Sequence, residues 1–269
     1  MQSILLHVGD DPAFPSRLQA ALDLVRQFDG QLTCSQVISY DVPVPGDYYG
    51  SAAGMILPIV REAAEKLREE TEQRLRREGV SYTWTMNYGV PTIYLAARAA
   101  LEDVVIAGPV DHDGHKGRPS QLVGWAVTAL RTPVLVPPVA VSLLDVDRPV
   151  LVAWNGSPES GRAVRSALPV LRRARSVVLS TVAEHHEFAH LPPLEAAEYL
   201  SRHGVAAELR ETAQAGESIA QRLLAEAESI GAGMIVMGAY GHSRLREMIF
   251  GGVTRQMLSD VRLPLLLSN

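Results

Sequence analysis

The sequence predicts an α/β protein made of two tandem domains, each with a doubly wound, mostly parallel sheet of five strands. Short apolar runs alternate with segments of helical periodicity along the whole chain, which favours right-handed crossovers and sheets covered on both faces. The same order of elements starts again near residue 150, and an internal repeat of this size indicates two copies of one domain. The corresponding pairs are Ile4 and Val150, Gly108 and Gly238, and Pro133 and Pro264.

The first half begins with an apolar run at 4–8, and Asp10-Asp11-Pro12 then signals a helix start. Leu18 and Leu22 follow at helical spacing. Pro91 stands near the first turn of a later helix, where its missing N–H costs little. The expected strands are 4–8, 31–39, 82–86, 103–107 and 133–136; the later helices are about 59–77, 91–100 and 121–130, and 40–50 and 110–119 are loops.

A segment at 139–148 is expected to link the halves, so that domains 1–144 and 145–269 result. In the second half, Ser157 is a helix cap before the apolar positions Ala163 and Val164. The expected strands are 150–154, 177–182, 205–209, 234–237 and 263–267, and the later helices are 194–202, 217–229 and 251–258. The apolar last strands of the two halves would be sticky edges alone, so we expect them to pack as an internal pseudo-dimer.

Composition narrows the classes of function. The chain has 269 residues, of which 47% are hydrophobic, enough for ordinary cores. Its single cysteine, Cys34, excludes an intrachain disulfide and a cysteine-based zinc cluster. A net charge of −5 argues against nucleic acid as the main partner. The sequence shows no leader or membrane-length apolar segment, so we expect a cytoplasmic protein without a membrane partner.

Glycines gather near the end of the chain. The strand 234–237 is followed by Gly238 and Gly241, and the pair Gly251 and Gly252 opens a helical pattern. Glycines let backbone amides approach phosphate oxygens, and a helix start adds unpaired amides and the positive end of its dipole. This geometry suits an anionic ligand. The alternative is a glycine-rich loop that binds no ligand.

The spacing of Gly238, Gly241 and Gly251 resembles the G-x2-G-x9-G-[ST] signature of the nucleotide-binding universal stress proteins, the UspA-like family, here in tandem form. Met237 and Val253 also fit the pattern, whereas Gly252 stands where Ser or Thr is expected. The resemblance implies a Rossmann-like fold with strand order 3-2-1-4-5, in which the loops after strands one and four lie side by side. It also implies ATP or a related adenine nucleotide as ligand, with or without Mg²⁺.

The resemblance assigns further roles in the second half. Asn155 replaces the usual Asp and would lie near the adenine or ribose, and Val182 matches a position against the adenine. Thr254 offers the nearest hydroxyl for a phosphate. Arg244 and Arg246 are phosphate contacts or solvated charges, and His242 is a pH-sensitive or a passive loop residue. The expected site comprises Ala153, Asn155, Val182, Met237, Gly238, Gly241, His242, Arg244, Gly251, Gly252, Val253 and Thr254.

The first half does not keep these residues. Asp111 stands opposite Gly241, and Ser120 and Gln121 stand opposite the glycine pair. A carboxylate repels phosphate, so we expect at most one nucleotide site per chain, in the second half.

We expect a stress-response regulatory module without catalytic residues, because the sequence shows no Walker A motif, nucleophile elbow or paired catalytic carboxylates. Slow ATP hydrolysis is the most activity expected. The Asp and His residues at 111–115 and the histidines at 185–190 are interpreted as loop residues, not metal ligands. Two alternatives remain: a nucleotide-free interaction scaffold with a decayed pocket, and an enzyme that hydrolyses ATP or transfers its adenylyl group. Homodimerisation beyond the internal pairing is also expected.

Overall fold

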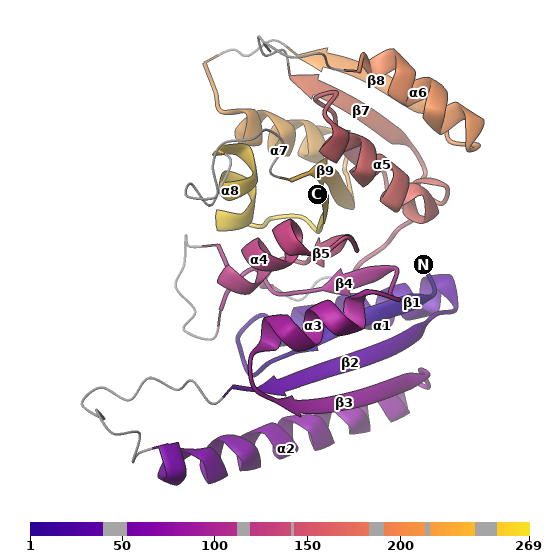
Figure 1. Ribbon diagram of the computed structural model, residues 1–269. Coiled ribbons are helices and arrows are strands. Elements are labelled where there is room, and N and C mark those ends of the chain that lie inside the picture. Colours follow the sequence, from indigo (N-terminus) through magenta and orange to yellow (C-terminus); the bar gives the residue numbers. More distant parts are fainter. Residues whose placement is uncertain (40–52, 112–118, 141–142, 183–190, 213–215, 240–251) are drawn as a thin grey trace.

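The computed structural model describes residues 1–39, 53–111, 119–140, 143–182, 191–212, 216–239 and 252–269. Within these ranges, ten strands form one sheet in the order β3-β2-β1-β4-β5-β10-β9-β6-β7-β8, with helices on both faces (Figure 1). The N-terminal half contains β1 (Ser3–Val8), α1 (Phe14–Phe28), β2 (Gln31–Ile38), α2 (Ala53–Arg77), β3 (Tyr82–Tyr88), α3 (Pro91–Ala99), β4 (Val104–Ile106), α4 (Gln121–Ala129) and β5 (Val134–Val136). The C-terminal half contains β6 (Val150–Ala153), α5 (Pro158–Leu171), β7 (Val177–Val182), α6 (Pro193–Arg202), β8 (Ala207–Thr212), α7 (Ile219–Ser229), β9 (Met234–Gly238), α8 (Gly252–Ser259) and β10 (Leu265–Ser268).

Each half is a doubly wound parallel sheet, as the sequence predicts. Neighbouring strands within a half run parallel, and the order 3-2-1-4-5 is repeated as 8-7-6-9-10. The side chains of β1 alternate between faces. Ile4 and Leu6 join the core cluster beneath α1, α2, α5 and α6, whereas Leu5 joins the cluster beneath α3, α4, α7 and α8. Both clusters contain residues from the two halves, so the cores are continuous along the sheet.

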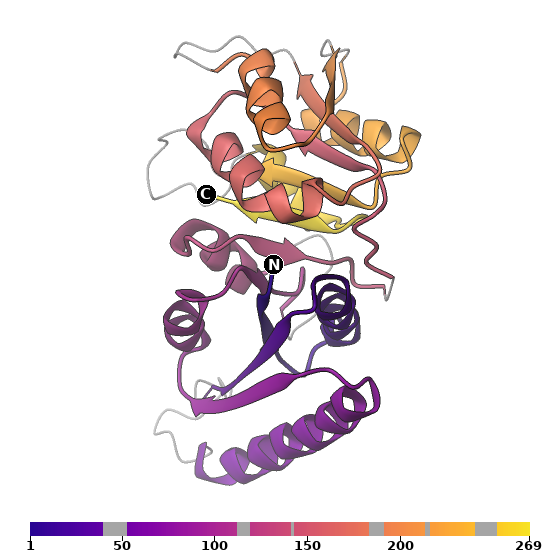
Figure 2. The ribbon, with the colours of Figure 1, turned by 90° about the vertical axis from the view of Figure 1, so that its right-hand side faces the viewer.

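The halves meet edge to edge through their last strands. β10 pairs with β5 antiparallel, with Leu265 opposite Val136, Leu266 opposite Leu135 and Leu267 opposite Val134. Figure 2 shows β10, in yellow, lying beside β5 where the halves meet. The predicted internal pseudo-dimer is confirmed, because each apolar strand covers an edge that would otherwise expose unpaired backbone groups.

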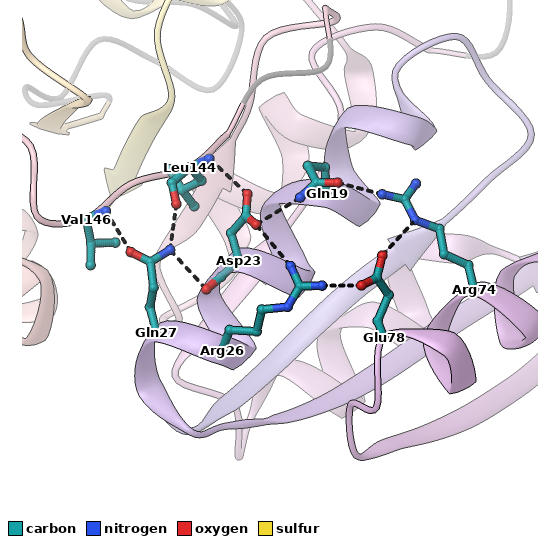
Figure 3. A network of polar contacts seen from close by, with 8 residues as sticks. All are labelled: Gln19, Asp23, Arg26, Gln27, Arg74, Glu78, Leu144 and Val146. Atoms are coloured by element: carbon teal, nitrogen blue, oxygen red, sulfur yellow. Dashed lines mark hydrogen bonds and ion pairs between the residues drawn. The ribbon is translucent and has the colours of Figure 1, made fainter.

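A polar network on α1 fixes the segment that enters the C-terminal half (Figure 3). Gln27 donates to the carbonyl of Leu144 at 2.6 Å and accepts from the amide of Val146 at 2.9 Å. Asp23 accepts from the amide of Leu144 at 2.9 Å and from the side chain of Gln19 at 2.8 Å. The segment is thus held by the N-terminal half up to Val146. A domain boundary between residues 144 and 145 stays a prediction.

Two predicted elements have a boundary that differs from the structure by three residues or more. The third strand of the C-terminal half spans Ala207–Thr212 rather than 205–209, because Val205 still belongs to the end of α6. Its amide donates to the carbonyl of Leu200 at 2.9 Å, across a left-handed Gly204 with φ of 78°. α2 begins at Ala53 rather than near residue 59, and Pro58 lies inside it. In the described part of the chain, no helix is both long enough and apolar enough to span a membrane.

Candidate functional site

The C-terminal half brings the ends of two central strands together. β6 and β9 pair in parallel with Ala153 opposite Met237, so both strands reach the same edge of the sheet. The chain winds outward in opposite directions from these two strands. In a doubly wound sheet, this reversal leaves the crevice in which ligands bind, beyond the carboxyl ends of the strands.

One wall of this region is apolar. Met237 belongs to the buried cluster on the α7 and α8 side, and Ala153 and Val253 pack against the same cluster from β6 and α8. Ala153 and Met237 are direct neighbours in the sheet, and Val253 belongs to the same apolar layer. Thr254 is buried on α8 together with Met257 and Leu258, and its contact with a phosphate stays a prediction.

Asn155 organises the loop between β6 and α5. Its side-chain oxygen accepts from the amide of Ser157 at 3.2 Å and from the Ser157 hydroxyl at 2.7 Å. The Ser157 hydroxyl in turn accepts from the amide of Ser160 at 3.2 Å and caps α5, as the sequence predicts. Among the described residues, the side-chain nitrogen of Asn155 has no hydrogen-bond partner, and the residue is exposed. Asn155 can therefore offer a donor to a ligand while its oxygen holds the loop.

Gly238 has a structural role that sequence reasoning missed. A Cβ added at this residue would lie 2.5 Å from the amide nitrogen of Ser160 and 2.6 Å from the carbonyl carbon of Glu159. Both are backbone atoms at the start of α5, so the missing side chain lets this helix pack directly on β9. Spacing alone could not separate this role from a close approach of phosphate.

Gly252 has the opposite surroundings. It opens α8 and is exposed, and among the described residues a Cβ built there has no neighbour within 4 Å outside the helix's own backbone. The other predicted phosphate-loop residues, Gly241, His242, Arg244, Arg246 and Gly251, lie outside the described residues. Val182 ends β7 opposite Thr212, and its side chain is likewise outside the description.

Residues 148–268 match the model of the Universal stress protein family. The C-terminal half is a universal stress protein domain. Along its full length the chain is similar in structure to a universal stress protein from Archaeoglobus fulgidus DSM 4304, with 18% sequence identity, 100% of this chain and 99% of that chain covered, and a TM-score of 0.74. A protein of this kind from Pseudomonas aeruginosa UCBPP-PA14 matches with 14% identity, coverage of 100% and 93%, and a TM-score of 0.60. The comparison with curated proteins gives no match.

At these identities the structural matches show the fold, and the chain as a whole is a tandem pair of universal stress protein folds.

The two domains differ in their crevices. In the N-terminal domain, Arg17 from α1 reaches the space between the ends of β1 and β4. Its side chain is 1% exposed and forms a two-bond ion pair with Asp11, at 2.7 and 2.6 Å. A Cβ added at Gly108 would lie 2.2 Å from the Arg17 guanidinium.

The start of α4 in the N-terminal domain is also occupied. The Ser120 hydroxyl and the Gln121 amide donate to the two carboxylate oxygens of Asp111, at 2.5 and 2.8 Å. The carboxylate of Asp111 therefore takes the place of a phosphate at this helix start, because it accepts the hydroxyl and the amide that a phosphate would use. Among the described residues, no group of three or more His, Cys, Asp or Glu side chains could hold a metal ion.

His7, near the end of β1, is expected to make the stability of the N-terminal domain depend on pH. Burial of the imidazole, and secondarily the charge of Arg17, lower the pKa of His7 from 6.5 to about 3, against an opposing effect of Asp11. Below pH 6.5 the unfolded chain takes up a proton that the folded chain resists until about pH 3. The stabilisation is therefore complete above pH 6.5 and is lost as the pH falls toward 3.

We expect the urea midpoint of the wild-type chain to fall more between pH 7.5 and pH 5 than that of His7→Gln, which cannot titrate. His7 keeps some exposure to solvent, and solvent screens its charge. Stability should therefore depend on pH less steeply than it would for the uptake of one full proton. Equal losses in the two proteins would show that His7 is protonated alike in the folded and unfolded chains.

Proposed function

We propose that the C-terminal universal stress domain binds ATP or a related adenine nucleotide and that the chain acts as a stress-response regulatory module. Membership of residues 148–268 in the family supports this proposal. The pairing of Ala153 with Met237 at the switch point of the sheet, with Asn155 in the loop that follows β6, supports it further. The apolar side chains suit a base, and the exposed amide of Asn155 suits a polar edge of the base or the ribose.

The observation that carries the proposal is the contrast between two equivalent helix starts. In the N-terminal domain, α4 begins with its amide and hydroxyl donors bound to Asp111. In the C-terminal domain, α8 begins at an exposed glycine, and no described atom lies within 4 Å of a Cβ built on it. Among the described residues, no carboxylate is bonded to the start of α8, so its amides and its dipole suit a phosphate.

The fold also supports a regulatory role. α8 leads within a few residues into β10, and β10 forms the junction with the N-terminal domain. A nucleotide that holds the start of α8 would favour one arrangement of the segment that joins the domains. Regulation would then be a population shift: the nucleotide would favour the arrangement of the two domains that binds it more tightly.

Gly252→Asp tests the proposal by giving α8 the internal anion that α4 already has. The open surroundings of Gly252 should accept the side chain, so we expect an intact fold and an ATP affinity at least about tenfold weaker, about 1.4 kcal/mol, because the carboxylate repels phosphate. Isothermal titration calorimetry measures the affinity. Ala225→Glu, which adds the same charge on an exposed position of α7, should bind like wild type. Equal affinities for wild type and Gly252→Asp would contradict the site.

The alternative is a nucleotide-free interaction scaffold with a decayed pocket, which the replacement of Ser or Thr by Gly252 and of Asp by Asn155 favours. Mass spectrometry of natively purified protein separates the two functions. A copurified adenine nucleotide contradicts the scaffold. The absence of heat on titration with ATP, AMP and cyclic AMP would contradict nucleotide binding.

A further inference from the structure

We propose that the N-terminal domain carries its own replacement for an anionic ligand: the Asp111 carboxylate occupies the anion position at the start of α4, and Arg17 fills the crevice beside it. This domain would therefore be fixed in an occupied state and would need no ligand. The proposal does not depend on nucleotide binding in the C-terminal domain.

The contacts of Asp111 are those of a bound anion rather than of a side chain at a helix cap. The cap position of α4 is already taken by Ser120, whose hydroxyl accepts from the amide of Val123 at 3.2 Å. Asp111 lies nine positions earlier in the chain, and its two oxygens receive a hydroxyl and a backbone amide at 2.5 and 2.8 Å. The Asp111 carboxylate, with one negative charge and several acceptor lone pairs, thus binds the donors at the positive end of α4 that a phosphate would otherwise bind.

Arg17 fills the second part of the crevice. Its Nε donates to the carbonyl of His7, near the end of β1, at 3.1 Å. The guanidinium lies so close to Gly108, after β4, that even a Cβ there would collide with it. The ends of the two strands that flank the switch point are therefore bridged by a buried cation, whose charge is balanced by Asp11.

The C-terminal domain lacks both devices at the corresponding places. The repeat that pairs Ile4 with Val150 places Ala163 opposite Arg17. Ala163 is buried and carries only a methyl group, so α5 sends no long side chain toward the end of β6 from this position. The position opposite Asp111 is Gly241 by sequence. The largest fully buried side chain of one domain is matched by an alanine in the other, which is the difference expected between a self-occupied and a ligand-binding copy.

The test is whether added anion can replace the carboxylate in the full chain. Hydrogen exchange followed by mass spectrometry should show the peptide covering residues 119–130 exchanging about tenfold faster in Asp111→Ala than in wild type, because the start of α4 loses its anion. Inorganic phosphate, exchanged for chloride at constant ionic strength, should restore the protection in Asp111→Ala and leave the peptide in wild type unchanged. Because the readout is local, phosphate bound in the C-terminal domain does not affect it.

Two further variants sharpen the result. Asp111→Asn keeps an acceptor and fills the position, so its partial loss of protection should not be reversed by phosphate. Glu69→Ala, the same loss of charge at an exposed position of α2, should match wild type. Unchanged protection in Asp111→Ala would overturn the proposal. So would lost protection that phosphate fails to restore, or an equal phosphate response in Asp111→Ala and Asp111→Asn.

Discussion

Gly238→Ala is expected to lower the free energy of unfolding by roughly 3 kcal/mol, the upper part of the range for overpacked cores. The added methyl group would lie 2.5 Å from the Ser160 amide nitrogen and 2.6 Å from the carbonyl carbon of Glu159. Both neighbours are backbone atoms of the first turn of α5, which cannot rotate away as the end of a side chain can. The helix would have to move off β9, and packing of α5 on β9 and β10 would be lost.

Urea denaturation measures this effect, and Gly161→Ala is the matched control. Gly161 lies in the same helix, and in the described part of the chain no atom outside the helix's own backbone lies within 4 Å of an added Cβ. Alanine there should stabilise the chain by about 0.5–1 kcal/mol through helix propensity. Equal stabilities for Gly238→Ala and wild type would show that α5 does not pack on β9 as described. The clash also means that lost ligand binding in a Gly238 variant cannot be assigned to the pocket, which is why Gly252→Asp is the better test of function.

Arg17→Met is expected to destabilise the chain by roughly 3–5 kcal/mol, the effect of removing one partner of a buried ion pair. Methionine fills much of the volume of the arginine stem, but it leaves the Asp11 carboxylate, 8% exposed, without its guanidinium. The carbonyl of His7 also loses a donor. Most of the loss in stability comes from the Asp11 carboxylate, which stays buried and charged without a partner. In the wild type, the attraction between the two side chains offsets the large desolvation penalty of burying them.

A double-mutant cycle separates the charge from the packing. Arg17→Met combined with Asp11→Asn removes the stranded charge, and the asparagine oxygen can still accept from the amide of Ala13, as Asp11 does at 3.0 Å. We expect the double variant to recover at least half of the stability lost by Arg17→Met in urea denaturation. A single variant within about 0.5 kcal/mol of wild type would contradict a buried, paired Arg17.

The fold could be predicted largely from the sequence because its signals are periodic and local. Apolar runs, cap residues such as Ser157 and the repeated order of elements each fix an element, and the apolar last strands predict the β5 and β10 junction. The miss at β8 has a local cause, since Val205 is as apolar as a strand residue but closes the end of α6.

The crevices could be predicted only in part, because their decisive contacts join residues far apart in the sequence. By its place in the repeat, Gly108 corresponds to Gly238, the first glycine of the phosphate-loop pattern. In the structure, its missing side chain makes room for the guanidinium of Arg17. Nothing in the helical pattern of α1 distinguishes Arg17 from a solvated arginine. Asp111 is recognisable as a departure from the glycine pattern, but its bonds to Ser120 and Gln121 depend on how the loop returns to α4.

The most direct measurement is a crystal structure of the full chain grown with ATP. We expect one nucleotide per chain, with its phosphates at the amides that start α8 near Gly252 and its base beside Asn155 and Met237. The N-terminal domain should keep the Arg17 and Asp11 pair and the Asp111 contacts unchanged. A nucleotide bound between β1 and β4, or protein side chains at the start of α8 where the phosphates should lie, would contradict it.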